Sequence, residues 1–445
     1  MGKLFGTDGV RGRANEKLTV ELAYKLGMAG AYVLTTIDHK PTILVGRDTR
    51  RSGDMLESAL VAGMCAVGAN VAVAGVIPTP AIAYLVREYK MDAGVMISAS
   101  HNPFEDNGIK FFNSKGYKLS DDIEAKIEEL ILNERPLPLM HGADVGYKVQ
   151  ADDACERYIS FLQSKANKPF DGIKIALDCA NGASSFIAPK VFGGLGADVI
   201  SIFDKPDGIN INAGCGSTHV EEISRLCREN ACIGFAFDGD ADRLIAIGED
   251  GRVVDGDCVM GICARFMKAN GLLKKDTVVS TIMSNLGLEE FLKDNGIDMP
   301  RTGVGDRYVL ERMLEEGYNF GGENSGHIIF LDHNTTGDGM LTAIMLLNVV
   351  LDSGRKLCEL KDDIRKYPQI LLNVRIASGR RDFENEKDVL DAIKQAEDEL
   401  GENGRVNVRA SGTEPVLRIM IEAKDEEKTI RLSNMIKDAM IRSLN

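Results

Sequence analysis

Short apolar runs that end in polar, glycine-rich turns recur along most of this 445-residue chain. The stretches "PTILVGRDTRRSG", "GIKIALDCANGASS" and "CIGFAFDGDADR" each begin as a β-rich run and stop at a cluster of Gly, Asn, Asp or Ser. Helical patterns often follow these turns, and strands that alternate with helices indicate mostly parallel sheets. Ligands gather beyond the carboxyl ends of such strands, which is where the polar turns fall.

Changes in the pattern of polar and apolar residues along the chain predict where its domains divide. The length alone suggests roughly three domains, and residues 133–149 look like a linker. Near the C-terminus, "NVRASGTEPVLRIMIEA" alternates more strongly, and "KDEEKTIRLSNMIKDAM" is typical of a closing helix. We predict three α/β domains with mixed, mostly parallel sheets, followed by a smaller C-terminal α+β domain. The predicted boundaries are 1–150, 151–252, 253–367 and 368–445.

Charge and composition exclude several classes of protein. The net charge of −14 and the absence of a basic block with aromatic residues argue against nucleic-acid binding. No apolar stretch is long enough to span a bilayer, and the start lacks a signal-peptide pattern. The nine cysteines contain no C-x-x-C, which favours reduced thiols in a cytoplasmic protein. An anionic small-molecule substrate stays compatible with the net charge, because local arginines and a metal can make one cleft positive.

Three aspartates follow one apolar run at alternate positions. Asp238, Asp240 and Asp242 are so close in "FAFDGDADR" that they repel one another unless a cation lies between them. In an extended segment their side chains would point to one side, and all-oxygen ligands suit Mg²⁺. A calcium-binding EF-hand loop is disfavoured because Arg243 occupies its sixth position, which requires Gly. A solvated acidic turn is the structural alternative.

The stretch "GVMISASHNP" brings a hydroxyl and an imidazole to the end of another apolar run. Ser100 and His101 follow that run, and Pro103 keeps the loop from becoming a helix. A Ser-His pair is usually a simple turn, and the absence of G-x-S-x-G leaves a serine hydrolase without support. Beside a metal, however, a serine can carry a phosphoryl group.

Two further loops offer groups that bind phosphates or sugars. In "RASGTEP", a guanidinium, two hydroxyls and a flexible backbone could form a phosphate site, although a polar hairpin turn explains the same residues equally well. In "GGENSGH", a carboxylate between glycines is suited to accept hydrogen bonds from sugar hydroxyls. The residues concerned are Arg409, Ser411, Gly412 and Thr413 in the first loop and Glu323, Asn324, Ser325 and His327 in the second.

Considered together, the four loops indicate one class of reaction. A site with a metal and a serine, plus a separate phosphate site, can hold two phosphates or one phosphate and one transferable group. A sugar-recognising loop between these sites fits a phosphosugar that is turned end for end. We therefore expect a phosphosugar mutase.

In this order, the four loops resemble those of the α-D-phosphohexomutase superfamily over essentially the whole chain. "SASHNP" is similar to its phosphoserine loop, "DGDADR" to its metal loop, "GENSGH" to its sugar loop and "RASGTEP" to its phosphate loop. The resemblance implies domains around a central cleft and Ser100 as the phosphoserine. It also implies one Mg²⁺ held by Asp238, Asp240, Asp242 and the serine phosphate, with a sugar 1,6-bisphosphate as activator.

The resemblance also assigns roles to single residues. Arg11 and Lys110 occupy positions proposed for acid–base catalysis, with His101 and His327 as further catalytic residues. Simple phosphate binding by Arg11 and Lys110 is an equal alternative, and a lysine base would need a lowered pKa. Asn324 is a departure, since relatives often carry Gln or Met there. The implied substrate contacts are Arg243, Glu323, Asn324, Ser325, Arg409, Ser411, Gly412, Thr413 and Arg418.

Stretches outside the four loops, among them "DGININAGCGSTH" and "GVGDRYV", resemble the amino-sugar members of the superfamily. They imply interconversion of glucosamine 6-phosphate and glucosamine 1-phosphate through glucosamine 1,6-bisphosphate, on the route to UDP-N-acetylglucosamine. The alternatives are the same chemistry on mannose or glucose phosphates, a sugar phosphatase, and a protein that only binds such ligands. A homodimer is frequent in the superfamily, although the sequence shows no interface signature.

Overall fold

The chain folds into two compact units. A computed structural model describes residues 4–6, 8–34, 39–376, 382–410 and 416–444. Unit 1 comprises residues 1–283 and 297–362, and unit 2 comprises residues 284–296 and 363–445. No helix in the described part of the chain is long and apolar enough to cross a membrane.

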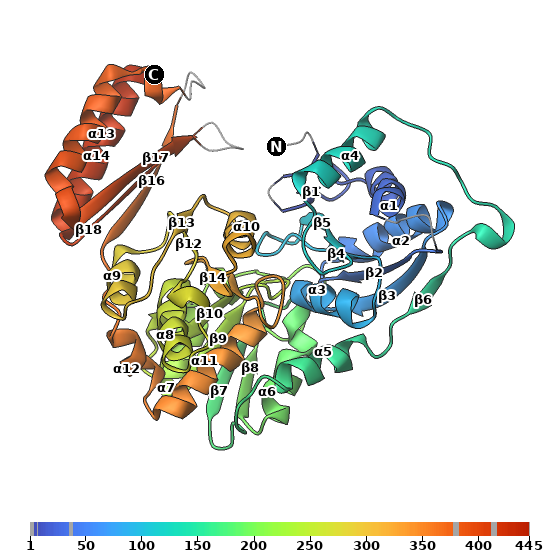
Figure 1. Cartoon of the computed structure of the whole chain (residues 1–445), viewed down its shortest axis with the longest axis horizontal. Coiled ribbons are helices and arrows are strands. Elements are labelled where there is room, and N and C mark those ends of the chain that lie inside the picture. The colour runs from blue at the N-terminus through green and yellow to red at the C-terminus, as the bar shows by residue number, and fades with distance from the viewer. Residues whose placement is uncertain (1–3, 7, 35–38, 377–381, 411–415, 445) are drawn as a thin grey trace. The chain divides into compact units, whose positions relative to one another are not determined.

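Unit 1 begins with a six-stranded mixed sheet in the order β1-β5-β4-β2-β3-β6. The strands β4, β2, β3 and β6 are parallel, whereas β5 is antiparallel to β4 and β1. The helices α1, α2 and α4 pack on one face, and α3 packs against β2 and β4 on the other (Figure 1). The bounds are β1 Val10–Arg13, α1 Val20–Leu34, β2 Thr42–Arg47, α2 Ser52–Ala66, β3 Asn70–Val76, α3 Thr79–Glu88, β4 Ala93–Ile97, β5 Asp106–Asn113, α4 Asp121–Leu132 and β6 Lys148–Gln150.

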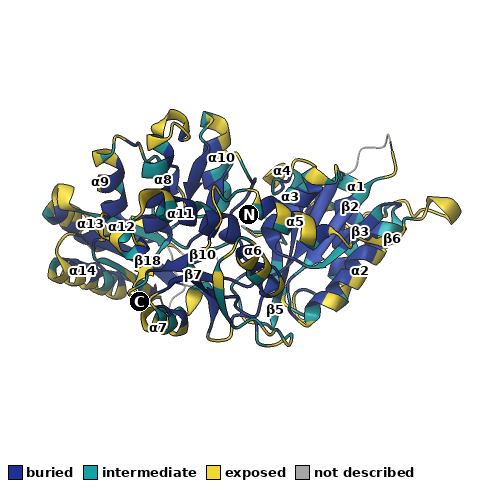
Figure 2. Cartoon of the chain, turned by 90° about the horizontal axis from the view of Figure 1, so that it is seen from below, coloured by how far each residue is buried: buried dark blue, intermediate teal, exposed yellow. Residues whose placement is uncertain are grey.

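A second sheet of five strands follows in the order β11-β10-β9-β7-β8. The strands β8, β7 and β9 are parallel, and β9 and β10 form an antiparallel hairpin. Strand β9 is buried throughout and β7 is buried after its first residue (Figure 2), which is why both strands are mainly apolar on both faces. The bounds are α5 Ala154–Gln163, β7 Lys174–Asp178, α6 Ala188–Gly194, β8 Asp198–Ile202, α7 Glu221–Asn230, β9 Ile233–Phe237, β10 Leu244–Ile247 and β11 Val253–Val254.

The last part of unit 1 has only short strand pairs among its described residues. β12 and β13 pair in parallel, and β14 and β15 form an antiparallel hairpin. A single parallel bridge between Val279 and Gly321 connects the two pairs. The bounds are α8 Gly256–Ala269, β12 Ser280–Thr281, β13 Arg301–Thr302, α10 Asp306–Glu316, β14 Phe320–Gly322, β15 Ile328–Phe330, α11 Gly339–Ser353 and α12 Leu357–Asp362.

Unit 2 is an antiparallel three-stranded sheet, in the order β16-β18-β17, with α13 and α14 on one face (Figure 1). Alternate residues of β18, Leu417, Ile419 and Ile421, form one buried cluster with residues of both helices. The predicted closing helix is confirmed as α14. The bounds are α9 Leu286–Asp294, β16 Gln369–Arg375, α13 Lys387–Leu400, β17 Gly404–Ala410, β18 Val416–Ala423 and α14 Glu426–Leu444.

The helix α9 lies within the third predicted domain in sequence but packs with unit 2. The side chain of Asn285 donates to the carbonyl of Tyr367 (3.0 Å) and accepts from its N–H (2.9 Å). The N–H of Leu286 donates to the buried carboxylate of Glu422 (2.9 Å). The predicted fold class, mixed α/β sheets with a smaller C-terminal α+β part, is confirmed. The four domain boundaries stay predictions.

A pair of glycines lets α1 and α2 pack closely. A Cβ atom on Gly27 would overlap the carbonyl of Leu60, and a Cβ atom on Gly63 would overlap the carbonyl of Tyr24. Both obstacles are backbone atoms, which cannot turn away as a flexible side chain could. The two helices therefore depend on residues without a side chain at their crossing.

We predict that Gly63→Ala destabilises unit 1 by about 1–3 kcal/mol, because overpacking against a backbone outweighs the better helix propensity of Ala. Gly193→Ala is the matched control, since Gly193 also lies in a helix but a Cβ atom there would contact nothing within 4 Å. Thermal unfolding should therefore show a lower Tm for Gly63→Ala and an equal or higher Tm for Gly193→Ala. Equal Tm values for the two variants would contradict the argument.

A buried carboxylate organises the loops at the end of β7. The two oxygens of Asp178 accept hydrogen bonds from the N–H groups of Ala180 and Gly216, each at 2.9 Å. Burial raises the pKa of Asp178 to about 6, although both N–H groups pull it down. Because the folded-state pKa lies above the ordinary value of 3.8, ionising Asp178 weakens the fold. The stabilisation from this group is complete at low pH and is lost as the pH rises through about 6.

We predict that Asp178→Asn changes how stability depends on pH. The variant loses one hydrogen bond at every pH, but it also removes the buried charge above pH 6. Its stability relative to the wild type should therefore improve between pH 4.5 and pH 7.5, by at most roughly 3 kcal/mol. Calorimetric Tm values at both pH values test this, with the exposed Asp171→Asn as control. A difference that is independent of pH would contradict the prediction.

Candidate functional site

The loop after β4 places a serine hydroxyl against a carboxylate. Ser100 is 1% exposed, and its φ of 52° lies in the left-handed region, which serine rarely adopts. Its Oγ donates a hydrogen bond of 2.5 Å to Oδ2 of Asp238. The Nδ1 atom of His101 is 3.3 Å from the same Oγ. The strand therefore delivers Ser100 to the loop that carries the three aspartates.

The three aspartates converge, but not in the way that the sequence suggested. One oxygen from each of Asp238, Asp240 and Asp242 lies within 4.8 Å of the others, and all three residues are buried. The expected extended segment is wrong, because the loop between β9 and β10 is a turn. The N–H of Ala241 donates to the carbonyl of Asp238 (3.0 Å), and Ala241 has a φ of 56°. The turn, rather than a strand, brings the carboxylates together.

The donor set fits a hard divalent cation. The Oδ1 atoms of Asp240 and Asp242 are buried without a hydrogen-bond partner among the described residues. Burial and the other two carboxylates raise the pKa of Asp238 well above its usual range. Three buried carboxylates with unsatisfied oxygens are stable together only when a cation balances them. An all-oxygen site of this kind is typical of Mg²⁺.

Lys110 of β5 is the protein's own cation beside the cluster. It is 1% exposed, and its Nζ lies 2.8 Å from Oδ2 of Asp240 and 3.1 Å from Oδ2 of Asp8. Burial would lower the pKa of Lys110, but Asp240, Asp8 and Asp242 outweigh it and raise the pKa. The lowered pKa that a lysine base requires is therefore not found here. In this geometry Lys110 is a buried positive charge that donates a hydrogen bond to Asp240.

Three residues that the sequence analysis did not select extend this charge network. Lys118 donates to Asp8 (2.6 Å) and to Asp306 at the start of α10 (2.5 Å). The Nη2 atom of Arg11 also pairs with Asp8, so Asp8 holds three cations in place. Burial opposes these charges, yet the three cations keep the pKa of Asp8 well below its usual range. Single charged residues at irregular spacing carry no motif, which is why they were missed.

The two predicted catalytic histidines have different surroundings. Burial, together with Arg243 and Arg11, lowers the pKa of His101 to about 4, so its ring is neutral at pH 7. His327 is buried, and its Nε2 accepts the N–H of Gly337 at 3.0 Å. The other ring nitrogen, Nδ1, lies 3.5 Å from Oδ2 of Asp242. His327 is thus fixed in orientation against the aspartate cluster.

The predicted sugar loop is the turn of the hairpin between β14 and β15. Glu323 is 8% exposed, its pKa is raised by burial, and its Oε1 accepts the N–H of Gly305 at 3.1 Å. The Oγ of Ser325 is buried without a hydrogen-bond partner in the described part of the chain. Asn324 holds the loop through its backbone, because its carbonyl accepts the N–H of Gly256 (3.2 Å). Arg243, the remaining predicted sugar contact in unit 1, lies in the aspartate loop, and its N–H donates to Asp238 (3.2 Å).

The predicted phosphate-binding residues belong to unit 2. Arg409 of β17 and Arg418 of β18 lie directly opposite each other in the sheet. Burial and the neighbouring Arg418 lower the pKa of Arg409. Like charges that face each other across two strands destabilise a sheet unless an anion lies between them. Ser411, Gly412 and Thr413 lie outside the described residues.

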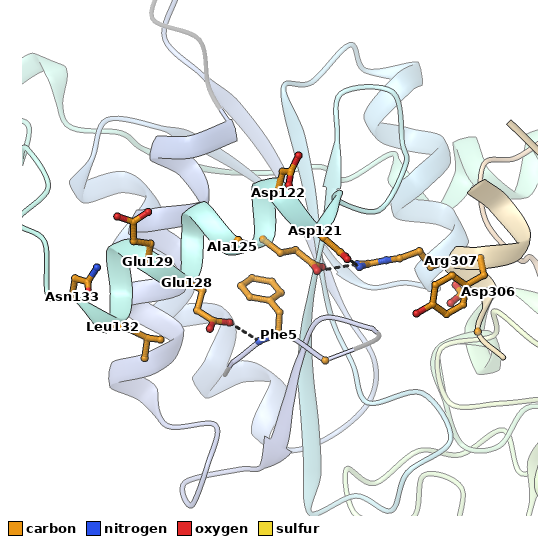
Figure 3. A pocket seen from close by; sticks show the side chains of 14 residues that line it. Phe5, Asp121, Asp122, Ala125, Glu128, Glu129, Leu132, Asn133, Asp306 and Arg307 are labelled. Atoms are coloured by element: carbon orange, nitrogen blue, oxygen red, sulfur yellow. Dashed lines mark hydrogen bonds and ion pairs between the residues drawn. The ribbon is translucent and has the colours of Figure 1, made fainter. Parts of the chain in front are cut away.

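A cavity of about 600 Å³ lies between α4 and the start of α10 (Figure 3). The predicted catalytic and metal-binding residues do not line it, although Asp306 of the charge network does. Several of its acidic side chains are paired within the protein. Glu124 contacts Arg307 at 2.9 Å, and Glu128 accepts the N–H groups of Leu4 (2.9 Å) and Phe5 (3.3 Å). The carboxylates of this cavity thus hold the N-terminal segment and α10 in place.

Comparison with known proteins agrees with the fold described above. Models of the phosphoglucomutase/phosphomannomutase family match as alpha/beta/alpha domain I over residues 2–137, domain II over 156–251, domain III over 255–367 and the C-terminal domain over 371–439. A solved structure described as a phosphoglucomutase/phosphomannomutase family protein from Burkholderia thailandensis has a TM-score of 0.83 at 22% identity, and the match covers 100% of this chain and 98% of that one. The N-acetylphosphoglucosamine mutase of Aspergillus fumigatus has a TM-score of 0.69 at 16% identity, covering 99% and 96%. At these identities the structures support the fold alone.

Curated relatives place the chain more narrowly. The phosphoglucosamine mutase of Ruminiclostridium cellulolyticum is 56% identical over 431 residues, which are 96% of this chain and 96% of that protein. The phosphoglucosamine mutase of Oceanobacillus iheyensis is 54% identical over 437 residues, which are 98% of each. The chain therefore belongs to the phosphoglucosamine mutases, within the phosphoglucomutase/phosphomannomutase family of α-D-phosphohexomutases.

Proposed function

We propose that this chain interconverts glucosamine 6-phosphate and glucosamine 1-phosphate through a phosphoryl group carried on Ser100. The observation that supports this most strongly is the 2.5 Å hydrogen bond from Ser100 Oγ to Asp238, inside a cluster of three buried carboxylates. The substrate follows from the relatives, which are phosphoglucosamine mutases at 51–56% identity.

The reaction needs two transfers and no further reactant. In the first, the Oγ–P bond of phosphorylated Ser100 breaks and an O–P bond forms at the free hydroxyl of the sugar phosphate, whose proton ends on Oγ. The product is glucosamine 1,6-bisphosphate. After this sugar turns around, its other phosphoryl group returns to Ser100. The cycle isomerises the substrate and releases no free phosphate. A sugar 1,6-bisphosphate primes an unphosphorylated enzyme by the same second step.

Charge neutralisation is the main task of the surrounding residues. Asp238, Asp240 and Asp242 would hold Mg²⁺, which when bound neutralises charge on the transferring phosphoryl group. Lys110 and Arg11 add fixed positive charge, because Asp8 and Asp240 hold both side chains in place. The neutral ring of His101, 3.3 Å from Oγ, is placed to relay the proton to the serine.

Substrate binding is assigned to two loops. Buried Glu323 and the hydroxyl of Ser325, which has no hydrogen-bond partner among the described residues, are suited to sugar hydroxyls, with Asn324, Arg243 and His327 around them. The facing arginines, Arg409 and Arg418, would hold whichever phosphate is not reacting, together with Ser411, Gly412 and Thr413. The homodimer and the cytoplasmic location stay predictions.

We predict that Ser100→Ala abolishes the mutase reaction. Phosphorus NMR of the wild type with Mg²⁺, glucosamine 6-phosphate and a trace of glucose 1,6-bisphosphate should show glucosamine 1-phosphate growing with little free phosphate. The variant should be at least about 1,000-fold slower, because it lacks the atom that carries the phosphoryl group. Ser58→Ala should match the wild type, because the Oγ of this exposed serine donates to the carbonyl of Asp54 in its own helix.

Other outcomes of the same experiment favour other functions. Free phosphate as the main product would make the protein a phosphatase. Faster turnover of mannose or glucose phosphates than of glucosamine phosphates would favour a phosphomannomutase/phosphoglucomutase. No reaction with any of the three sugars would leave a protein that only binds them.

We predict that the metal is required and is held by the three aspartates. Treatment with EDTA should abolish turnover, and Mg²⁺ should restore it and raise the Tm of the wild type. Asp242→Asn should weaken Mg²⁺ binding at least tenfold in calorimetric titration, because it removes one charged ligand. Asp250→Asn makes the same charge change in the turn after β10, outside the cluster, and should leave Mg²⁺ binding unchanged. Equal Mg²⁺ affinity in the two variants would reject this assignment.

A further inference from the structure

A fully buried arginine directs all its hydrogen-bond donors to carbonyls of the Ser100 loop and to Asp48. Arg50 follows β2, and its side chain is 0% exposed. Its Nη2 donates to the carbonyls of Ser100 (2.9 Å) and Asn102 (2.8 Å). Its Nη1 donates to the carbonyls of Pro103 and Asp106, and its Nε donates to Asp48 (2.9 Å). A guanidinium has five N–H donors, so none is left for a substrate.

Asp48 restrains the N–H of Ser100 through the hydroxyl of Ser98. Its Oδ2 accepts the hydroxyl of Ser98 at 2.6 Å. The Oγ of Ser98 in turn accepts the N–H of Ser100 at 2.9 Å. The backbone of Ser100 is therefore fixed at both its N–H and its carbonyl by groups that do not touch its hydroxyl.

A residue from the loop after β8 repeats the contacts of Arg50. Asn212 lies in the stretch "DGININAGCGSTH", and its Nδ2 donates to the carbonyls of Ser100 (2.8 Å) and Asn102 (3.0 Å). These are the two carbonyls that Arg50 Nη2 contacts. The predicted metal loop packs against this carbonyl of Ser100 and against Asn212. A Cβ atom on Gly239 would lie 2.6 Å from the carbonyl of Ser100 and 3.0 Å from Nδ2 of Asn212.

We infer that Arg50 and Asn212 are positioning residues that clamp the carbonyls of Ser100 and Asn102 from two sides, and so hold Ser100 in its left-handed conformation with its hydroxyl toward Asp238. The inference rests on the proposed function insofar as Ser100 is the residue that carries the phosphoryl group. We refer to the two side chains and the two carbonyls as the carbonyl clamp.

The left-handed conformation explains why such a clamp is needed. Glycine adopts a φ of 52° easily, but a glycine has no hydroxyl to carry a phosphoryl group. Serine must therefore occupy a conformation that disfavours a side chain, and the surroundings must hold it there. Four hydrogen bonds on the carbonyls of Ser100 and Asn102, from one guanidinium and one carboxamide, provide that restraint.

Asn212 allows a cleaner test than Arg50, whose removal would leave several buried carbonyls unsatisfied. Asn212 itself has a φ of 57°, so Asn212→Gly removes the donor without straining the backbone. Asn210→Ala is the matched control in the same loop, because among the described residues the side chain of Asn210 bonds to the backbone of Lys205 and Asp207 and not to the Ser100 loop. Asn212→Asp keeps the shape but replaces the donor with an acceptor.

Three readouts separate positioning from a general structural role. The kcat of Asn212→Gly for glucosamine 6-phosphate should fall about 10- to 100-fold, while its KM changes less than threefold, because the substrate contacts remain. Phosphorylation of Ser100 by glucose 1,6-bisphosphate, followed by intact mass, should slow by a similar factor. Amide hydrogen exchange of residues 98–106 should become faster than in Asn210→Ala, while both variants keep the same Tm. Asn212→Asp should behave like Asn212→Gly.

The inference is overturned if Asn212→Gly exchanges and turns over like the wild type, or if Asn210→Ala loses the same activity. A fall in kcat that is matched by a lower Tm would also overturn it, since that would be a stability effect. Hydrogen exchange does not depend on the substrate. Faster exchange in Asn212→Gly, with a wild type that is inactive on glucosamine phosphates, would refute the proposed function and leave the clamp in place.

Discussion

The site depends on how the protein offsets the burial of several carboxylates in one place. Three aspartates share the turn after β9, and two more, Asp8 and Asp306, lie close by. Buried charges of one sign are tolerated only when cations reach them. Here Lys110 lies between Asp240 and Asp8, and Lys118 lies between Asp8 and Asp306. Because these residues come from β5, the N-terminal segment, the loop after β9 and α10, charge balance ties distant parts of unit 1 to one point.

Electrostatic balance fixes which segments meet, whereas backbone hydrogen bonds fix how the hydroxyl of Ser100 is oriented. The hydroxyl of Ser100 is directed by contacts to its carbonyl and N–H, and the aspartates converge through a turn with a left-handed alanine. In both loops the conformation is one that the residue would rarely adopt alone. The rigid strands β4 and β9 and their buried neighbours restrain it.

Sequence patterns were better at identifying candidate catalytic and metal-binding residues than at identifying the residues that position them. Ser100 and the three aspartates could be selected because their types and spacing suit a metal and a phosphoryl group, and the alternation of strands and helices gave the fold class. The extended geometry predicted for the aspartates was wrong, since periodicity does not reveal a tight turn. Asp8, Lys118 and Arg50 were missed because their partners lie far away in sequence or are backbone carbonyls, which look the same at every residue. The association of α9 with unit 2 depends on residues about 80 to 140 positions away, through the backbone of Tyr367 and the side chain of Glu422.

The place of α9 determines how parts of this protein could be exchanged with those of its relatives. Unit 2 is built from two pieces of chain, so its sequence is interrupted by residues 297–362 of unit 1. A chimera that imported only residues 363–445 would join a foreign sheet to a native α9, and the buried carboxylate of Glu422 would face an unmatched helix. The unit that can be exchanged is therefore the pair of segments 284–296 and 363–445 together. Recombination within this family therefore has to preserve α9 and the C-terminal sheet as one linked set, even though residues 297–362 of unit 1 separate them in the sequence.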